Sequence, residues 1–473
     1  MEFFNLLSKA IPVYGQTFDV SLNWIGNLIK GLIELVGGAG LVGLGIILFS
    51  LILKLIVLPF DVYQRITMRK QNQKMKEQQE RMAKLQKQYA NDKAMYNQKL
   101  MEMYKENGIS MFSSCLPMIL SLVVFIVAIN AFNAYAQYSN VESYNTLVDA
   151  YNKKIESYCP DLKEENITFS GDKIIVKNDD PNAYIYYELP AGEFTSVNDD
   201  TLSYIQDHTD KTYYIDMAKA ENNAEITALV TAEKTLEDAA YEYFVSEAQS
   251  AVVKAYEQGL NGEMAVSDKS RFLWIKNIWV TDASYKHPVL NYADFKAEAK
   301  REEFKVGDKK VSYEDISAYT GAYDEGAYNL ITAKLTVQKE QSNGYFVLIA
   351  LSIGTILLQQ FVMMRSQKEQ QKFSSVDGQA ASQQKMTMIV MTVMFAIFSF
   401  MYSSAFSIYM ITSNLFSLAS TLIINKFVDK SLDKKAEAAS TQRLDNRRTA
   451  KIEAAKNAGK TSAKESRDKK NKN

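Results

Sequence analysis

The sequence has few of the residues that build disulfide frameworks or metal sites. Only two cysteines occur among 473 residues, Cys115 and Cys159, and their surroundings differ too much for a disulfide framework. The two histidines, His208 and His287, stand far apart with no thiol nearby, so we expect no zinc site and no other cofactor. The first 17 residues lack the features of a signal peptide, so we expect the N-terminus to remain in the mature protein.

Charge is also missing over a long stretch of the chain. The whole sequence has 54 Lys and Arg against 55 Asp and Glu, which resembles a soluble protein. Residues 386–425, however, contain no Asp, Glu, Lys, Arg or His. Because a membrane span needs about 20 predominantly apolar residues, a run of this length excludes a soluble fold.

Five apolar segments are long enough to cross a bilayer. They are residues 37–60, 112–134 and 344–364, and two segments within 386–427. The last range is too long for one span, so we expect the chain to turn near Ser403 and Ser404. The sequence therefore predicts an all-α polytopic membrane protein with five transmembrane helices.

The charges between the spans predict the orientation. Residues 61–108 hold 11 basic and 6 acidic side chains, and residues 426–473 hold 15 and 7, whereas residues 135–343 hold 21 and 37. Short loops rich in Lys and Arg stay in the cytoplasm. A multi-pass arrangement with the N-terminus outside and the C-terminus in the cytoplasm follows from this bias and from five spans.

This orientation assigns each segment to one side of the membrane. We expect a cytoplasmic helical hairpin at 61–111, a cytoplasmic loop at 365–385 and a basic cytoplasmic tail at 428–473. The acidic range 135–343, called the insertion domain below, should be extracytoplasmic. Residues 1–36 should include an amphipathic helix along the outer membrane interface, because apolar residues recur with helical spacing from Phe18 to Val36.

The insertion domain has patterns of both strands and helices. Alternating runs at 173–177 and 183–189 predict strands, and turn residues flank them. Residues 221–260 and 292–304 have helical spacing. We therefore expect an inserted α+β domain.

The hairpin has a narrow apolar row. Met68, Met75, Met82 and Tyr89 recur every seven residues, and Asn107-Gly108 predicts a helix end after the second helix. The methionines either pack the two helices together or form a flexible surface that contacts substrate.

Lys54 is the most informative single residue, because a cation at the bilayer centre costs about 2.5–3.5 kcal/mol on insertion scales. Lys54 lies near the cytoplasmic end of its span, so its side chain could simply extend to the interface. Alternatively, it could line a wet groove together with polar residues of later spans, among them Gln359, Gln360 and Thr412. Those residues could equally form hydrogen bonds between helices.

Five stretches together resemble the YidC/Oxa/Alb family of membrane protein insertases. They are LILKLIVLPF at 51–60, KLMEMYKENGISMFSSCLPMIL at 99–120, FLWIKNIWVTD at 272–282, ILLQQ at 356–360 and SIYMITSNLFSLASTLIIN at 407–425. They occur in the family's order, and the resemblance extends to every span and the hairpin, roughly half of the chain. The resemblance implies a bacterial plasma-membrane insertase and chaperone with a hydrophilic groove open to the cytoplasm and to lipid, and no catalytic chemistry.

The resemblance also implies which residues form the groove and which partners the protein has. The groove residues would be Lys54, Gln359, Gln360, Tyr409, Met410 and Thr412. The hairpin would receive substrate, and the partners would be nascent membrane proteins, the ribosome, the lipid bilayer and, as a candidate, the Sec translocon. Three departures stand out: Lys54 replaces the usual arginine, Met410 replaces a common aromatic residue, and Ser403-Ser404-Ala405 replaces a proline-glycine pattern.

The basic tail could bind either of two partners. Arg443, Arg447, Arg448 and Lys451 could contact anionic lipid or ribosomal RNA, and the family resemblance favours the ribosome. Two other functions stay open on the residues alone. One is a small transporter or channel subunit with an extracytoplasmic ligand-binding domain, and the other is a receptor. Neither an inverted repeat nor a nucleotide-binding motif supports them.

Overall fold

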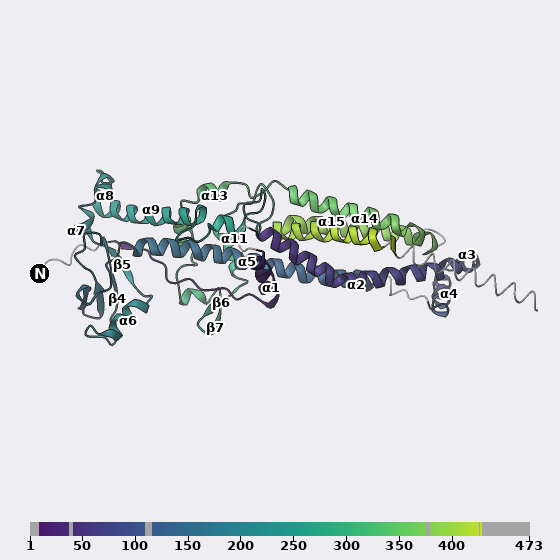
Figure 1. The fold of residues 1–473 in the computed structure, drawn as a ribbon, viewed down its shortest axis with the longest axis horizontal. Helices are drawn as coiled ribbons and strands as arrows, with labels where there is room; N and C mark the ends of the chain where they lie inside the picture. The colour runs from purple at the N-terminus through teal and green to yellow at the C-terminus, as the bar shows by residue number, and fades with distance from the viewer. Residues whose placement is uncertain (1–8, 37–40, 109–115, 375–378, 425, 428–473) are drawn as a thin grey trace, which may run out of the picture. The chain divides into compact units, whose positions relative to one another are not determined.

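The structure is a computed structural model that describes residues 9–36, 41–108, 116–374, 379–424 and 426–427 (Figure 1). The α-helices are α1 (Trp24–Leu35), α2 (Val42–Glu77), α3 (Gln79–Gln88), α4 (Lys93–Glu106), α5 (Leu116–Glu156), α6 (Asp199–Asp207), α7 (Met217–Ala220), α8 (Ala224–Ala228), α9 (Leu236–Glu257), α10 (Val266–Ser270), α11 (Tyr292–Ala299), α12 (Glu325–Ile331), α13 (Thr336–Glu340), α14 (Val347–Ser374), α15 (Gln379–Met401) and an unlabelled helix, Ser404–Ile424. The strands are β1 (Ala10–Ile11), β2 (Ile167–Ser170), β3 (Lys173–Val176), β4 (Ile185–Pro190), β5 (Thr212–Ile215), β6 (Glu303–Val306) and β7 (Lys309–Ser312), and Glu164–Asn166 and Ile316–Ala318 form short 3₁₀ turns. The fold is therefore mostly helical with a small sheet, as predicted.

The described residues form two compact units. The first comprises the residues up to Ile52, Val123–Ile356 and Val390–Thr412. The second comprises the described residues of Leu53–Leu122 and Leu357–Ile389, and those from Ser413 onward.

The first unit contains an antiparallel sheet of five strands in the order β1-β5-β4-β3-β2. Tyrosines set its central register, because Tyr187 pairs with Tyr213 and Tyr186 with Tyr214. Successive side chains of a strand point to opposite faces. Tyr187 and Tyr213 are accordingly buried, whereas the rings of Tyr186 and Tyr214 stack at 5.5 Å on the other face. The strands predicted at 173–177 and 183–189 correspond to β3 and β4.

One continuous apolar core joins this sheet to the helices of the insertion domain. α5 and α9 both contribute fully buried side chains, including Tyr151 of α5 and Phe244 of α9. Aromatic contacts extend the core to α11 and α12, where the ring of Phe295 stacks on that of Tyr328 at 4.7 Å. The insertion domain thus has a core of its own, which is what an independently stable domain needs.

The N-terminal segment differs from the prediction of one helix from Phe18 to Val36. The helix α1 begins at Trp24, with Asn23 as its N-cap. The chain before it forms an isolated antiparallel bridge from Val20 to Phe304, in which Ser21 N donates to Glu303 O at 2.8 Å and Lys305 N donates to Asp19 O at 2.8 Å. Phe18 and Val20 are buried in the core of the insertion domain. Their burial there overrides the helical spacing that the sequence suggested.

Two predicted helices of the insertion domain are also too long. The prediction of a helix at 221–260 is wrong in part, because α8 ends at Ala228 and α9 begins only at Leu236, where the Thr235 hydroxyl accepts from Asp238 N. The helix predicted at 292–304 ends at Ala299. Phe304 instead lies in β6, which pairs with β7 in a hairpin, and its side chain is fully buried. Tertiary burial again decides the local structure.

Three helical segments in the described residues are long and apolar enough to cross a membrane. They are Val42–Thr67, Val347–Arg365 and Ser404–Ile424, and Met388–Met401 is a shorter apolar helix. The break between α15 and the next helix falls at Tyr402 and Ser403, near the predicted turn. The second predicted span, 112–134, begins outside the described residues, so a fifth span and the orientation of all spans remain predictions.

Large apolar side chains are exposed on these helices. They include Leu55, Ile56, Phe60, Leu357, Leu358, Phe361, Leu415, Leu422 and Ile423. A soluble protein rarely exposes contiguous apolar surface of this kind. The exposed apolar faces support integration of these helices in a membrane.

Candidate functional site

A row of charged residues follows one side of α2. Lys54 is half-buried, whereas the next two residues, Leu55 and Ile56, are 55% and 63% exposed. Asp61 lies seven residues after Lys54, and Arg65 follows four residues later, so all three lie on one side of the helix. Asp61 is close enough to attract both cations. By helical spacing, Lys54 and Ile56 lie on opposite sides of α2.

Arg65 connects α2 to the helix Ser404–Ile424 within the second unit. Its Nη2 atom donates to Thr421 Oγ1 at 2.5 Å, and Thr421 is buried. Thr421 Oγ1 in turn donates to Ser417 O in its own helix at 2.6 Å. The polar row on α2 thus continues to a hydroxyl on a second helix.

The two predicted groove glutamines lie on α14 in the same unit, and both are half-buried. Gln360 Nε2 donates to Met388 O of α15 at 3.4 Å. That contact is long for a hydrogen bond. It is the helix-to-helix role that the sequence left open beside the groove role.

The other predicted groove residues belong to the first unit. Tyr409 and Met410 are buried, and Thr412 is half-buried. The ring of Tyr409 lies 5.5 Å from that of Phe132 and 6.0 Å from that of Phe406. Tyr409 therefore packs in an aromatic cluster. Because these residues and Lys54 fall in different units, a groove formed by both sets remains a prediction.

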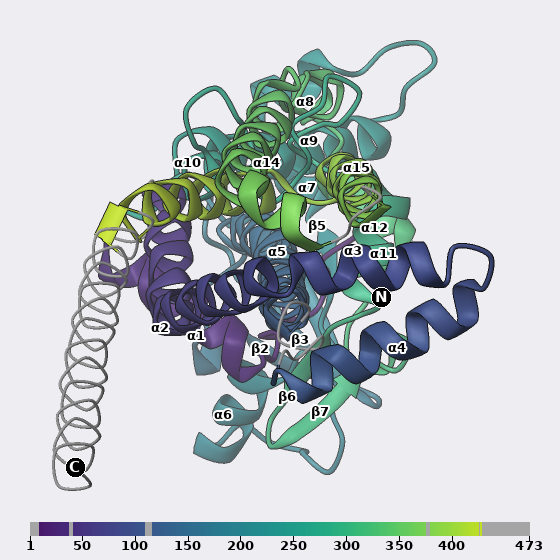
Figure 2. The ribbon, with the colours of Figure 1, turned by 90° about the vertical axis from the view of Figure 1, so that its right-hand side faces the viewer.

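The hairpin is built from α3 and α4, and Figure 2 shows α4 turning back beside α3. Met82, Met103 and Tyr104 form its buried core, and Met75, Leu85 and Leu100 pack against them. Arg81 and Glu106 form an ion pair at 3.1 Å, and Gly108 takes the positive φ of 59° that ends α4. Tyr89 is half-buried at the end of α3, and the side chain of Met68 lies outside the described residues. The methionines in view thus pack the two helices together.

One loop, to which the sequence analysis assigned no structural role, binds the beginnings of two candidate spans. We call residues 276–283 the helix-end loop. Both side-chain oxygens of Asp282 accept hydrogen bonds at the start of α14, from Tyr345 N just before the helix at 2.7 Å and from Leu348 N in its first turn at 2.6 Å. Ser404 N and Ala405 N donate to the carbonyls of Val280 and Ile278, at 3.0 and 2.9 Å. The first N–H groups of a helix have no partner within it, so this loop supplies their acceptors.

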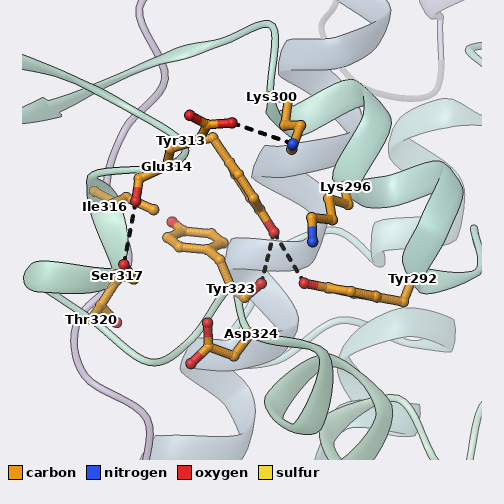
Figure 3. A pocket seen from close by; sticks show the side chains of 10 residues that line it. All are labelled: Tyr292, Lys296, Lys300, Tyr313, Glu314, Ile316, Ser317, Thr320, Tyr323 and Asp324. Atoms are coloured by element: carbon orange, nitrogen blue, oxygen red, sulfur yellow. Dashed lines mark hydrogen bonds and ion pairs between the residues drawn. The ribbon is translucent and has the colours of Figure 1, made fainter.

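A cavity of about 300 Å³ opens in the insertion domain, between α11 and the segment from Tyr313 to Asp324 (Figure 3). Its polar groups mostly engage one another. The hydroxyls of Tyr292 and Tyr313 are 3.4 Å apart, Tyr313 Oη donates to Tyr323 O at 2.9 Å, and Lys300 pairs with Glu314 at 3.3 Å. Within the described part of the chain, no group of three or more His, Cys, Asp or Glu side chains could hold a metal ion. The tail residues Arg443, Arg447, Arg448 and Lys451 lie outside the described residues.

Comparison with known proteins gives one consistent family. A sequence profile described as "60Kd inner membrane protein" matches residues 34–176 and 249–431. Proteins named "Membrane protein insertase YidC" from Clostridium perfringens, Caldanaerobacter subterraneus and Fusobacterium nucleatum are 35%, 31% and 32% identical over 104, 116 and 121 residues. These alignments cover 22%, 24% and 26% of this chain and 42%, 53% and 49% of the relatives, so the chain spans about half the length of each.

No solved structure matches the chain. The profile covers more than half of the sequence, including the candidate spans, the hairpin and the helix-end loop. The protein is integral to a membrane by its exposed apolar helices, and it belongs to the 60Kd inner membrane protein family, the family of the YidC, Oxa and Alb insertases.

Proposed function

We propose that the protein is a membrane protein insertase and chaperone that works without covalent chemistry. Nascent transmembrane segments would enter the bilayer through a hydrophilic groove open to the cytoplasm and to lipid. The observation that carries the proposal is Lys54, a half-buried cation inside the candidate span Val42–Thr67. Family membership supplies the second support.

The physical task of such a protein is to lower the cost of moving polar groups through hydrocarbon. Unsatisfied backbone groups in a bilayer cost several kcal/mol each, and charged side chains are costly as well. Lys54 would attract acidic side chains of a translocating segment, and Asp61 would keep the empty site from presenting an unbalanced charge. Gln359 and Gln360 would offer amide groups to the passing backbone.

The test is a reconstituted insertion assay with a substrate whose translocated tail is acidic. We expect Lys54→Arg to keep activity, because the charge is retained. Lys54→Glu should reduce insertion by roughly tenfold or more, since like charges repel in a site of low dielectric constant. Insertion by Lys54→Glu at the unsubstituted rate would refute the role of the charge.

Lys70→Glu is the matched control, because Lys70 lies on the same helix beyond the candidate span and is exposed. It makes the same change in net charge and should leave insertion unchanged. Equal loss in both variants would point to total charge and not to residue 54.

We infer a ribosome contact for the basic tail, through the clustered cations at 443–451. Binding to ribosomal RNA by clustered cations weakens steeply with salt. Deleting the chain after Asp429 should therefore abolish cosedimentation with ribosomes at low salt, and persistence of the complex would count against this contact.

A further inference from the structure

Three buried asparagines form a continuous hydrogen-bonded chain through the first unit. Asn140 lies on α5, Asn277 in the helix-end loop and Asn343 just before α14. Asn277 Nδ2 donates to Asn140 Oδ1 at 3.2 Å, and Asn277 N donates to Asn343 Oδ1 at 2.7 Å. Asn343 Nδ2 donates back to Asn277 O at 2.9 Å. The three side chains are 7%, 7% and 0% exposed, so no water can readily replace these partners.

The asparagine chain begins at the packed face of α5 in the insertion domain. Asn140 Nδ2 donates to Glu298 Oε2 of α11 at 2.6 Å, and Asn277 Nδ2 also donates to Pro288 O at 3.0 Å. Asn277 Oδ1 accepts from Trp279 N at 3.0 Å. Asn277 therefore binds α5 through its donor atom and the backbone of the helix-end loop through its acceptor atom.

The asparagine chain ends at the first turns of two candidate spans. Asn343 Nδ2 lies 3.3 Å from Val280 O and 3.0 Å from Thr281 O. Val280 O also accepts from Ser404 N at 3.0 Å and from Ser404 Oγ at 2.7 Å. The next residues of the loop accept from α14 through Asp282. The Val280 carbonyl thus receives hydrogen bonds from both the asparagine chain and the helix Ser404–Ile424.

We propose that Asn140 and Asn277 are positioning residues that transmit the placement of the insertion domain to the beginnings of α14 and the helix Ser404–Ile424. The reason is the geometry of the amide group, which donates and accepts at once and so joins backbone groups of three separate segments. A buried hydrogen-bonding group that loses its partner is costly, so the loop keeps one arrangement while the asparagines are present. The insertion domain then fixes where these two helices begin.

Hydrogen exchange in the full-length protein in detergent tests this inference without any substrate, and so independently of the proposed function. Asn140→Ala should speed exchange of the amides at residues 345–350 and 402–408 by roughly threefold to tenfold, the effect of losing one net hydrogen bond. The Asn140 side chain bonds to Asn277 and Glu298 and not to the amides that are measured. A faster exchange there would therefore have been transmitted through the asparagine chain.

Asn145→Ala is the matched control. Asn145 lies on the same helix, is 6% exposed, and bonds to Phe18 O and to Tyr323 Oη, neither of which belongs to the helix-end loop. It should loosen the insertion domain to a similar extent while leaving exchange at 345–350 and 402–408 unchanged. General destabilisation would move those amides in both variants alike, and that result would overturn the proposal.

Unchanged exchange at residues 345–350 and 402–408 in Asn140→Ala would also overturn the proposal. If that variant does not fold, Asn277→Asp serves in its place, because the aspartate keeps the acceptor for Trp279 N and loses the donors to Asn140 and Pro288. It should speed exchange at 402–408 by a similar factor, and an unchanged rate would be contrary to the inference.

Discussion

Glu298 shows how a single side chain in the insertion domain links stability to pH. Burial raises the pKa of Glu298 to about 7, a shift that the hydrogen bond from Asn140 and the nearby charges of Arg301 and Lys286 only partly oppose. Asp294 adds to the increase. A carboxyl whose pKa is higher in the folded state stabilises the fold when protonated. That contribution is complete below the unfolded pKa, near 4.5, and is lost as the pH rises through about 7.

We therefore expect Glu298→Gln to unfold at a higher temperature than the unsubstituted protein at pH 8, because glutamine mimics the protonated acid. The gain should be roughly 1–3 kcal/mol at pH 8 and should vanish near pH 3.5, below the unfolded pKa. Thermal unfolding of the purified protein at both pH values measures it. Glu193→Gln, at an exposed position, should show no such difference, and parallel unfolding of Glu298→Gln and the unsubstituted protein at both pH values would contradict the prediction.

At this scale the sequence revealed only part of the site. Lys54 was identifiable because a charge inside an apolar run is conspicuous, and Gln359 and Gln360 stood out for the same reason. Asp282 and Asn343 gave no such signal, since both are common loop residues. Their roles arise from contacts between segments far apart in sequence, such as the bond between Asn140 and Asn277, 137 residues apart. Local pattern carries no information about such pairs.

The hairpin is the element whose internal packing can be tested most directly. Met103 is 1% exposed and Met101 is 53% exposed, although both lie on α4. Met103→Ala should destabilise the packing of α3 on α4 by roughly 2–5 kcal/mol, because it removes buried apolar volume and leaves a cavity. Limited proteolysis should then cut the turn between α3 and α4 markedly faster.

Met101→Ala supplies the comparison, and its cleavage rate should match that of the unsubstituted protein. Equal cleavage of the two variants would show that Met103 does not hold the helices together. It would then favour the reading in which the hairpin methionines serve as a surface for substrate.

Prediction at the scale of elements succeeded where burial and local pattern agree. The alternating residues of β3 and β4 face a core on one side, so a period of two was visible in the sequence. The segments at 18–36 and 292–304 also have helical spacing, but Phe18, Val20 and Phe304 enter the core of the insertion domain. Side chains bind the backbones of Phe18 and Val20, and Phe304 lies in the strand β6. β1, with two residues, was too short to be recognised.

The predicted orientation concerns the whole molecule and can be tested by cysteine labelling in intact cells. Ser170 ends β2 and Lys93 begins α4, and both are exposed. Ser170→Cys should react with a membrane-impermeant thiol reagent from outside, whereas Lys93→Cys should react only after the membrane is opened. The opposite pattern would reverse the topology, and labelling of both from outside would contradict a cytoplasmic hairpin.

The native thiols need little alteration for that experiment. Burial raises the pKa of the Cys159 thiol to about 12, with a further increase from Glu156, so the reactive thiolate is scarce at neutral pH. Cys159 can therefore remain, and only Cys115, which lies outside the described residues, would be replaced by serine. A strain carrying that single replacement serves as the unlabelled reference.

α5 is one unbroken helix of 41 residues, about 60 Å long at the usual rise. Its residues from Val123 onward all belong to the first unit, and they run from the predicted second span into the core of the insertion domain. An antibody fragment bound to the sheet of that domain would consequently keep a fixed position relative to α5 from Val123 onward. For a chain of 53.5 kDa, such a rigid handle would give electron cryomicroscopy the landmark needed to align particle images.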